Sequence, residues 1–181
     1  IGLGVMIAIG TKNFDEFLDG AYEMDQHFKN APLEENMPVL LGLIGIWHIN
    51  ICEYPTRAIL PYDQRLSSFP SYIQQLDMES NGKSISSSGE MLYEKTGAIV
   101  WGDAGTNSQH SFFQLLHQGP QIVPCEFMLG VNKSESNMKE HNDLLIANCL
   151  AQSQALMAGR RVDEVIRVLE KRGVSHEESI R

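Results

Sequence analysis

Two polar runs of this sequence carry the residue types that acid–base chemistry needs. The first is Q-Q-L-D-M-E-S-N-G-K at residues 74–83, and the second is W-G-D-A-G-T-N-S-Q-H-S-F-F-Q-L-L-H-Q-G at residues 101–119. Proton transfer requires a carboxylate and an imidazole held by hydrogen-bonded neighbours. Glu79 in the first run and His110 in the second are the candidates, so we expect a site that uses both.

Glu79 lies where a predicted helix meets a turn at Asn81-Gly82. A carboxylate at that junction can act as a general base, with Gln75, Ser80 and Asn81 orienting it or a ligand. The alternative is a helix-end carboxylate that is hydrogen-bonded within the turn and has no chemical role. The pattern of residues leaves both interpretations open.

His110 falls in the first turn of a helix predicted at residues 107–116, just after Gly102 and Gly105. A helix N-terminus disfavours the imidazolium, so a neutral ring there can donate or accept a proton. The alternative is a packed polar residue in a turn. His117 lies seven residues later, just past the end of this predicted helix, and we interpret it as structural.

Composition narrows the class of protein. A length of 181 residues with 43% hydrophobic residues predicts one domain with a sizeable core. The formal net charge of −9 argues against a nucleic-acid-binding protein. The longest apolar run, residues 39–47, is too short to cross a bilayer, so we expect no membrane partner. Three widely spaced cysteines without a C-x-x-C pair predict free thiols, no metal site and a reducing, cytoplasmic location.

The elements that position these candidates alternate between helix and strand. Short strands are predicted at residues 56–60, 98–101 and 121–129, and a polar loop at 132–139. Besides the helix at 107–116, capped by Thr106 or Asn107, helices are predicted at 14–30 (capped by Asn13), 36–52, 67–76, 143–158 and 162–172. This alternation predicts an α/β fold, with a parallel sheet and helices on both faces. Sites in such sheets lie past the carboxyl ends of the strands, which is where His110 is expected.

Residues 1–11 have the pattern of the end of a buried helix, and the chain does not begin with Met. We therefore expect this chain to be an interior piece of a longer protein.

The sequence resembles the glucose-6-phosphate isomerase family over nearly its whole length. The matching motifs are M-D-Q-H-F (24–28), P-L-E-x-N-x-P-V-L-L (32–41), L-P-Y-D-Q (60–64), D-M-E-S-N-G-K (77–83), G-T-N-x-Q-H-S-F-x-Q-L-x-H-Q-G (105–119) and L-A-Q-S-Q-A-L-M (150–157). The resemblance implies the sugar isomerase (SIS) fold, whose subunits hold two doubly wound α/β domains. Residues 1–181 would then be part of one or both domains, mostly the second.

The resemblance also implies an activity in glycolysis and gluconeogenesis. The family interconverts glucose 6-phosphate and fructose 6-phosphate by ring opening and proton transfer between C1 and C2 through a cis-enediol(ate). It places the proton-transferring base at Glu79, a substrate contact at Gln75 and the ring-opening histidine at His110. It implies no cofactor or metal, a sugar phosphate substrate, and a homodimer in which His110 reaches the neighbouring subunit's site. The family's phosphate loop, an arginine and a catalytic lysine fall outside residues 1–181, so we expect this piece alone to be inactive.

Some positions depart from the family pattern. Asp103, Ala104 and Ser108 replace the usual Glu, Pro and Gly of W-G-E-P-G-T-N-G-Q-H, and Ser108 is expected to add a side chain next to the site. Glu126 replaces the usual Asp of P-C-D-F. Two other functions compete with the isomerase, a non-catalytic SIS-type module that binds sugar phosphate and a non-enzymatic interaction protein. The retained Glu79 and His110 favour the enzyme.

Overall fold

The computed structural model describes residues 2–130 and 139–180. Strands β1 (Thr56–Pro61), β2 (Ile99–Gly102) and β3 (Cys125–Met128) form the sheet. The α-helices are α1 (Leu3–Ile9), α2 (Thr11–Asn30), α3 (Met37–Ile46), α4 (Phe69–Ile73), α5 (Gly105–Ser108), α6 (Phe113–Gln118), α7 (Lys139–Ala158), α8 (Val162–Lys171) and α9 (His176–Ser179). Two π-helices, η1 (Trp47–Ile51) and η3 (Gln74–Glu79), and a 3₁₀ helix, η2 (Gln64–Leu66), complete the elements.

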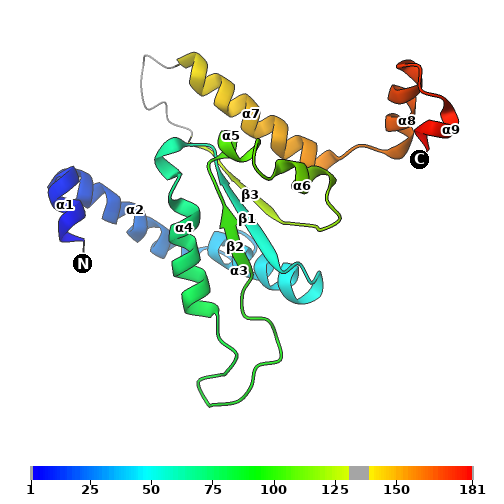
Figure 1. Ribbon diagram of the computed structural model, residues 1–181. Coiled ribbons are helices and arrows are strands. Elements are labelled where there is room, and N and C mark those ends of the chain that lie inside the picture. The colour runs from blue at the N-terminus through cyan, green and yellow to red at the C-terminus, as the bar shows by residue number, and fades with distance from the viewer. Residues whose placement is uncertain (1, 131–138, 181) are drawn as a thin grey trace.

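The sheet is parallel, with strand order β2-β1-β3. Ala58, Leu60 and Tyr62 point to one face, where they pack with Phe113 of α6 and Cys149 of α7. Side chains on the opposite face meet η3, which continues α4 along the sheet (Figure 1). The predicted parallel sheet with helices on both faces is therefore confirmed.

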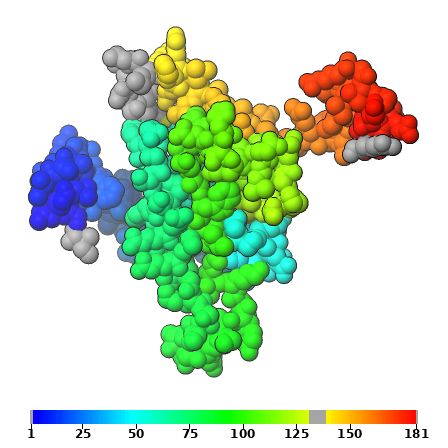
Figure 2. Space-filling view, viewed as in Figure 1, coloured from blue at the N-terminus to red at the C-terminus, as the bar shows by residue number. Residues whose placement is uncertain are grey.

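The two ends of the chain extend away from the sheet. Figure 2 shows α1 and α2, in blue, on one side of the molecule and α8 and α9, in red, on the other. The prediction of a buried helix at the start is wrong, because α1 exposes Leu3, Val5 and Ile7 by 50% or more. The cap assigned to Asn13 is also wrong. Helix α2 already begins at Thr11, and the Asn13 side-chain amide donates to the Ile9 carbonyl at 2.7 Å.

Helix α3 begins as the sequence predicts. The Asn36 side chain accepts a hydrogen bond from the Val39 amide, and Pro38 lies in the first turn. The expectation that this helix is buried is wrong, since Leu41 and Leu43 are more than half exposed. None of the described helices has the combination of length and apolar sequence that a transmembrane span requires.

The helix predicted at residues 107–116 is two helices. Helix α5 ends at Ser108 and α6 begins at Phe113, with a turn between them. Phe112 packs edge-on against Trp101 with ring centroids 4.8 Å apart, while the adjacent Phe113 enters the core. Consecutive residues of one helix point about 100° apart, so the turn lets both rings reach apolar surroundings.

Most other predicted elements are present with shifted ends. Strand β3 is shorter than residues 121–129 and only half-buried. Helix α7 begins four residues before the predicted 143. Helix α8 ends at Lys171, and Gly173 follows two residues later with a φ of 87°, which suits glycine. The loop predicted at 132–139 lies outside the described residues, except for Lys139 at the start of α7.

A methyl group added at Gly105 tests how tightly the turn after β2 is packed. It would overlap the ring of Tyr62, which is 1% exposed and cannot move aside. We expect Gly105→Ala to lower the free energy of unfolding by about 1–3 kcal/mol, the usual cost of overpacking a core. Urea unfolding measures this change.

Gly20→Ala is the matched control for that substitution. Gly20 lies in α2 with nothing within 4 Å of an added Cβ. Alanine favours a helix by about 1 kcal/mol over glycine, so this variant should gain stability. Equal effects of the two substitutions would contradict the packing assigned to Gly105.

Candidate functional site

The first candidate residues lie in the π-helix η3. It continues α4, whose first turn contains Pro70, and helical structure persists to Asn81 before Gly82 ends it. A π-helical turn widens the helix and is frequent at functional sites. Gln75 and Glu79 both lie in η3 and are exposed, so the structure keeps these two candidates together on one element.

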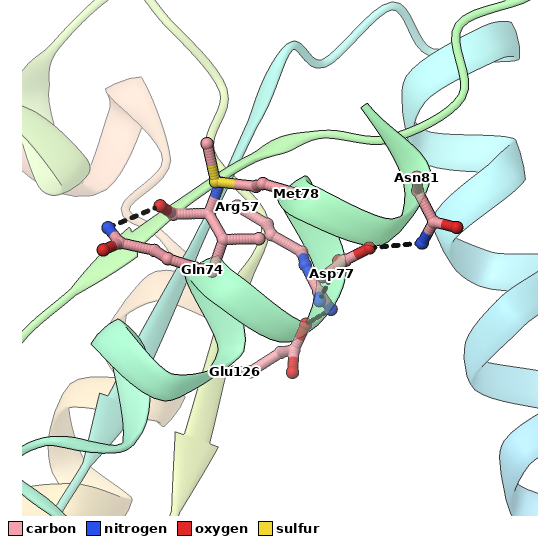
Figure 3. Close-up of polar contacts among 7 residues, drawn as sticks. Arg57, Gln74, Asp77, Met78, Asn81 and Glu126 are labelled. Carbon is pink, nitrogen blue, oxygen red and sulfur yellow. Dashed lines mark hydrogen bonds and ion pairs between the residues drawn. The ribbon is translucent and has the colours of Figure 1, made fainter. Parts of the chain in front are cut away.

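The inner face of η3 is bonded to the sheet. The Gln74 side chain donates to the Val100 carbonyl at 3.0 Å, and the Val100 amide donates to the Met78 sulfur at 3.4 Å. From β1, the Arg57 guanidinium contacts the Asp77 carboxylate at 2.7 Å (Figure 3). These contacts leave the other side of η3 open to solvent.

Glu79 is held through its backbone. The Lys83 ammonium donates to the Glu79 carbonyl at 2.6 Å. Within residues 2–130 and 139–180, nothing forms a hydrogen bond with the Glu79 carboxylate. An exposed carboxylate on a fixed backbone is able to accept a proton from a bound molecule, and the alternative of a carboxylate tied into the turn finds no support among these contacts.

His110 lies in the turn between α5 and α6, and it is exposed. Its prediction in the first turn of a helix is therefore wrong, and the argument from a helix N-terminus does not apply. The preceding Gln109 donates from its side chain to the Tyr62 hydroxyl at 2.9 Å. Burial raises the pKa of Tyr62, opposed by the Gln109 hydrogen bond and reinforced by nearby Cys149. The phenol therefore stays neutral and anchors the turn. His117 contacts Gln152 of α7 at 2.8 Å, in line with a structural role.

Helix η3, which contains Glu79, continues α4 away from α5, and the turn that contains His110 follows α5 (Figure 1). The contacts of neighbouring residues place Glu79 and His110 near opposite ends of β1. Near Glu79, Asp77 contacts Arg57, the second residue of β1. Near His110, Gln109 contacts Tyr62, which follows the last residue of β1. At about 3.3 Å per residue, β1 spans roughly 17 Å between these points. One copy of the chain therefore brings Gln75 and Glu79 together and leaves His110 apart, past the carboxyl ends of the strands.

A cleft of about 880 Å³ opens between α3 and the amino ends of the strands. Arg57, Asp77 and Asn81 form one wall, and Leu41 and Ile44 of α3 belong to the other. Glu79 and Gln75 are not among the lining residues. Across residues 2–130 and 139–180, no three His, Cys, Asp or Glu side chains are grouped as metal ligands would be.

The positions that depart from the family pattern have clear structural roles. Ser108 is completely buried, and its hydroxyl donates to the Gly105 carbonyl at 2.8 Å. The expectation that Ser108 adds a side chain next to the site is therefore wrong. Asp103 accepts from the Ala104 amide at 2.7 Å. Glu126 accepts from Arg57 at 2.7 Å. Sequence reasoning missed the Arg57 contacts, because its partners lie 20 and 69 residues away.

Comparisons with known proteins identify the family and the fold. The sequence profile described as phosphoglucose isomerase matches residues 1–180. The chain is 58% identical over 177 residues to a glucose-6-phosphate isomerase from Xanthobacter autotrophicus, covering 98% of this chain and 32% of that protein. It is 60% identical over 164 residues to one from Mesorhizobium japonicum, covering 91% and 30%. A crystal structure of a glucose-6-phosphate isomerase from Chlamydia trachomatis superposes with a TM-score of 0.76 at 44% identity, covering 85% of this chain and 31% of that one.

The parallel sheet with helices on both faces, and its superposition on a solved isomerase, define an α/β sugar isomerase fold. Within that class, the chain belongs to the phosphoglucose isomerase family. It spans about a third of the length of the curated relatives that it matches.

Proposed function

We propose that the protein carrying this chain interconverts glucose 6-phosphate and fructose 6-phosphate, as an aldose–ketose isomerase. Family membership over residues 1–180 and relatives named glucose-6-phosphate isomerase support this proposal. The retained Glu79 and His110 favour catalysis over a binding-only module.

Glu79 is the proton-transferring base in this proposal. With the sugar ring open, its carboxylate takes the proton from C2 of glucose 6-phosphate and delivers it to C1, through a cis-enediol(ate). The exposed carboxylate on a backbone held by Lys83 supports this role. Gln75, one turn earlier on η3, contacts the substrate, and His110 assists ring opening. This route uses side chains only and calls for no metal or organic cofactor.

The placement of His110 supports a shared site in a C₂ homodimer. Glu79 and His110 are separated by the length of β1 within one subunit. A two-fold axis makes the same surface patch meet itself across the interface, so one subunit can supply a residue to its partner's site. Each site then takes Glu79 from one subunit and His110 from the other. Residues 1–181 form mostly the second SIS-type domain of such a subunit, and the location is cytoplasmic.

Turnover by the full-length protein tests the proposed activity. Fructose 6-phosphate is supplied, and formation of glucose 6-phosphate is followed with an excess of a coupled dehydrogenase. Conversion supports the isomerase. Binding of sugar phosphate by calorimetry without conversion would instead indicate the non-catalytic module.

Residues 1–181 alone should not catalyse the conversion. One copy leaves Glu79 and His110 at opposite ends of the sheet, and an acidic chain with a net charge of −9 repels a dianionic phosphate unless local donors hold it. We expect the purified piece to show no isomerisation in the coupled assay. The full-length protein at the same concentration is the control, and measurable conversion by the piece would contradict this expectation.

A further inference from the structure

Arg57 joins three elements that are distant in the sequence. It lies in β1, and its guanidinium contacts Asp77 of η3 at 2.7 Å and Glu126 of β3 at 2.7 Å (Figure 3). The side chains of Arg57 and Asp77 are 28% and 22% exposed, so water screens this pair only in part. Charge-assisted hydrogen bonds of this length to a planar guanidinium also fix geometry.

The Asp77 carboxylate is used on both oxygens. One oxygen accepts from Arg57, and the other accepts from the Asn81 side-chain amide at 2.6 Å. Asp77 and Asn81 lie two residues before and two residues after Glu79. The contacts from Asp77 therefore bracket Glu79 and tie its helix to the sheet.

Other contacts fix the rotation of η3. Gln74 and Met78 bond to the carbonyl and the amide of Val100 in β2. With Gln74, Asp77 and Met78 all turned to the sheet, Gln75 and Glu79 are left on the exposed side. A shift of Asp77 would therefore move the Glu79 backbone along with it.

We propose that Arg57 and Asp77 are positioning residues, which hold Glu79 at its proton-transfer distance by clamping η3 to β1. This inference rests on the proposed role of Glu79 as the base. Neither residue touches the substrate in the proposal. A displacement near 1 Å can cost as much as about 100-fold in rate. The clamp therefore acts mainly on the rate of proton transfer, with a smaller effect on substrate affinity through Gln75 on the same helix.

The two ion pairs of Arg57, with Asp77 and with Glu126, allow a matched pair of variants in the full-length protein. Asp77→Asn removes the negative charge from the contact that holds η3, and Glu126→Gln removes it from a contact of the same length that holds β3. We expect Asp77→Asn to lower kcat roughly tenfold with KM within about twofold. We expect Glu126→Gln to keep kcat within about twofold. A purely structural role of Arg57 predicts equal losses, and that result would overturn the proposal.

Proton transfer itself supplies a second readout. Glucose 6-phosphate deuterated at C2 and supplied as the substrate should show a larger isotope effect on kcat in Asp77→Asn than in wild type. A displaced base makes proton transfer more rate-limiting. Glu126→Gln should match wild type. An unchanged isotope effect in Asp77→Asn would contradict positioning of the base.

A double-mutant cycle tests whether Arg57 acts through Asp77. Arg57→Met should lower kcat about as much as Asp77→Asn, and the double variant should lose no more than either alone, because contacting residues are not additive. Arg57→Lys keeps a cation and should recover part of the loss. Fully additive losses would overturn the proposal.

Hydrogen exchange of the amides in residues 74–82 reports on the clamp without catalysis. Exchange should rise in Asp77→Asn and stay unchanged in Glu126→Gln, and the rest of the exchange pattern shows that each variant is folded. Unchanged exchange in Asp77→Asn would overturn the clamp.

Glu79→Gln measured in parallel separates the two proposals. Wild-type turnover by Glu79→Gln would rule out Glu79 as the base. Inactive Glu79→Gln with equal losses in Asp77→Asn and Glu126→Gln would overturn only the positioning role.

Discussion

Replacing Glu79 by Gln in the full-length protein should lower kcat by at least about 100-fold, the usual loss when a general base is removed. Glutamine keeps the size and polarity of the side chain and removes its ability to accept the C2 proton. The Glu79 carbonyl and its hydrogen bond from Lys83 are unaffected by this change. Substrate affinity should therefore stay within a few-fold of wild type, as measured by calorimetry.

Glu90→Gln is the control for this substitution. Glu90 is an exposed glutamate in the loop that follows η3, eleven residues beyond Glu79. The same change of charge there should alter kcat by less than about twofold, since surface substitutions far from a site have small effects. Near-normal turnover in Glu79→Gln would rule out Glu79 as the base.

Mixing two inactive variants should restore activity to about a quarter of wild type. The variants are full-length Glu79→Gln and His110→Asn, unfolded and refolded together in equal amounts. In a mixed C₂ dimer with shared sites, one site collects both substitutions and the other collects neither. Random pairing makes about half of the dimers mixed, and each has one intact site of two. The coupled assay measures the recovery, and mass spectrometry confirms the mixed dimers.

The reverse mixture makes the test quantitative. Wild type is refolded with the double variant Glu79→Gln/His110→Asn. With shared sites, both sites of a mixed dimer carry one substitution, so only about a quarter of the wild-type activity remains. With sites built within one subunit, about half remains, and the first mixture recovers nothing. That second set of results would refute the shared site.

Local sequence determined several features of this protein by itself. Asn36 and Pro38 mark the start of α3 because a side-chain cap and a fixed proline φ act within one turn of helix. The short apolar runs around Ala58 and Val100 form strands, and both residues are buried. The motif D-M-E-S-N-G-K identified Glu79, and the structure keeps it exposed on the same helix as Gln75. These are signals that a few neighbouring residues carry.

Only the tertiary structure decided how the candidate residues lie relative to one another. At the turn that contains His110, Phe112 packs edge-on against Trp101 and Phe113 enters the core beside it, an arrangement that the local pattern did not show. The burial predicted for α1 and α3 failed, because an apolar pattern shows that a face is apolar without showing what covers it.

The positions of Glu79 and His110 relative to the sheet were also decided by the tertiary structure. The parallel order β2-β1-β3 puts Glu79 beside the amino ends of the strands and His110 beyond their carboxyl ends. Arg57 meets Asp77 and Glu126 only because the sheet brings residues 20 and 69 positions apart into contact. The sequence by itself singled out the candidate residues. Strand pairing and packing decided their separation, because those contacts depend on distant parts of the chain.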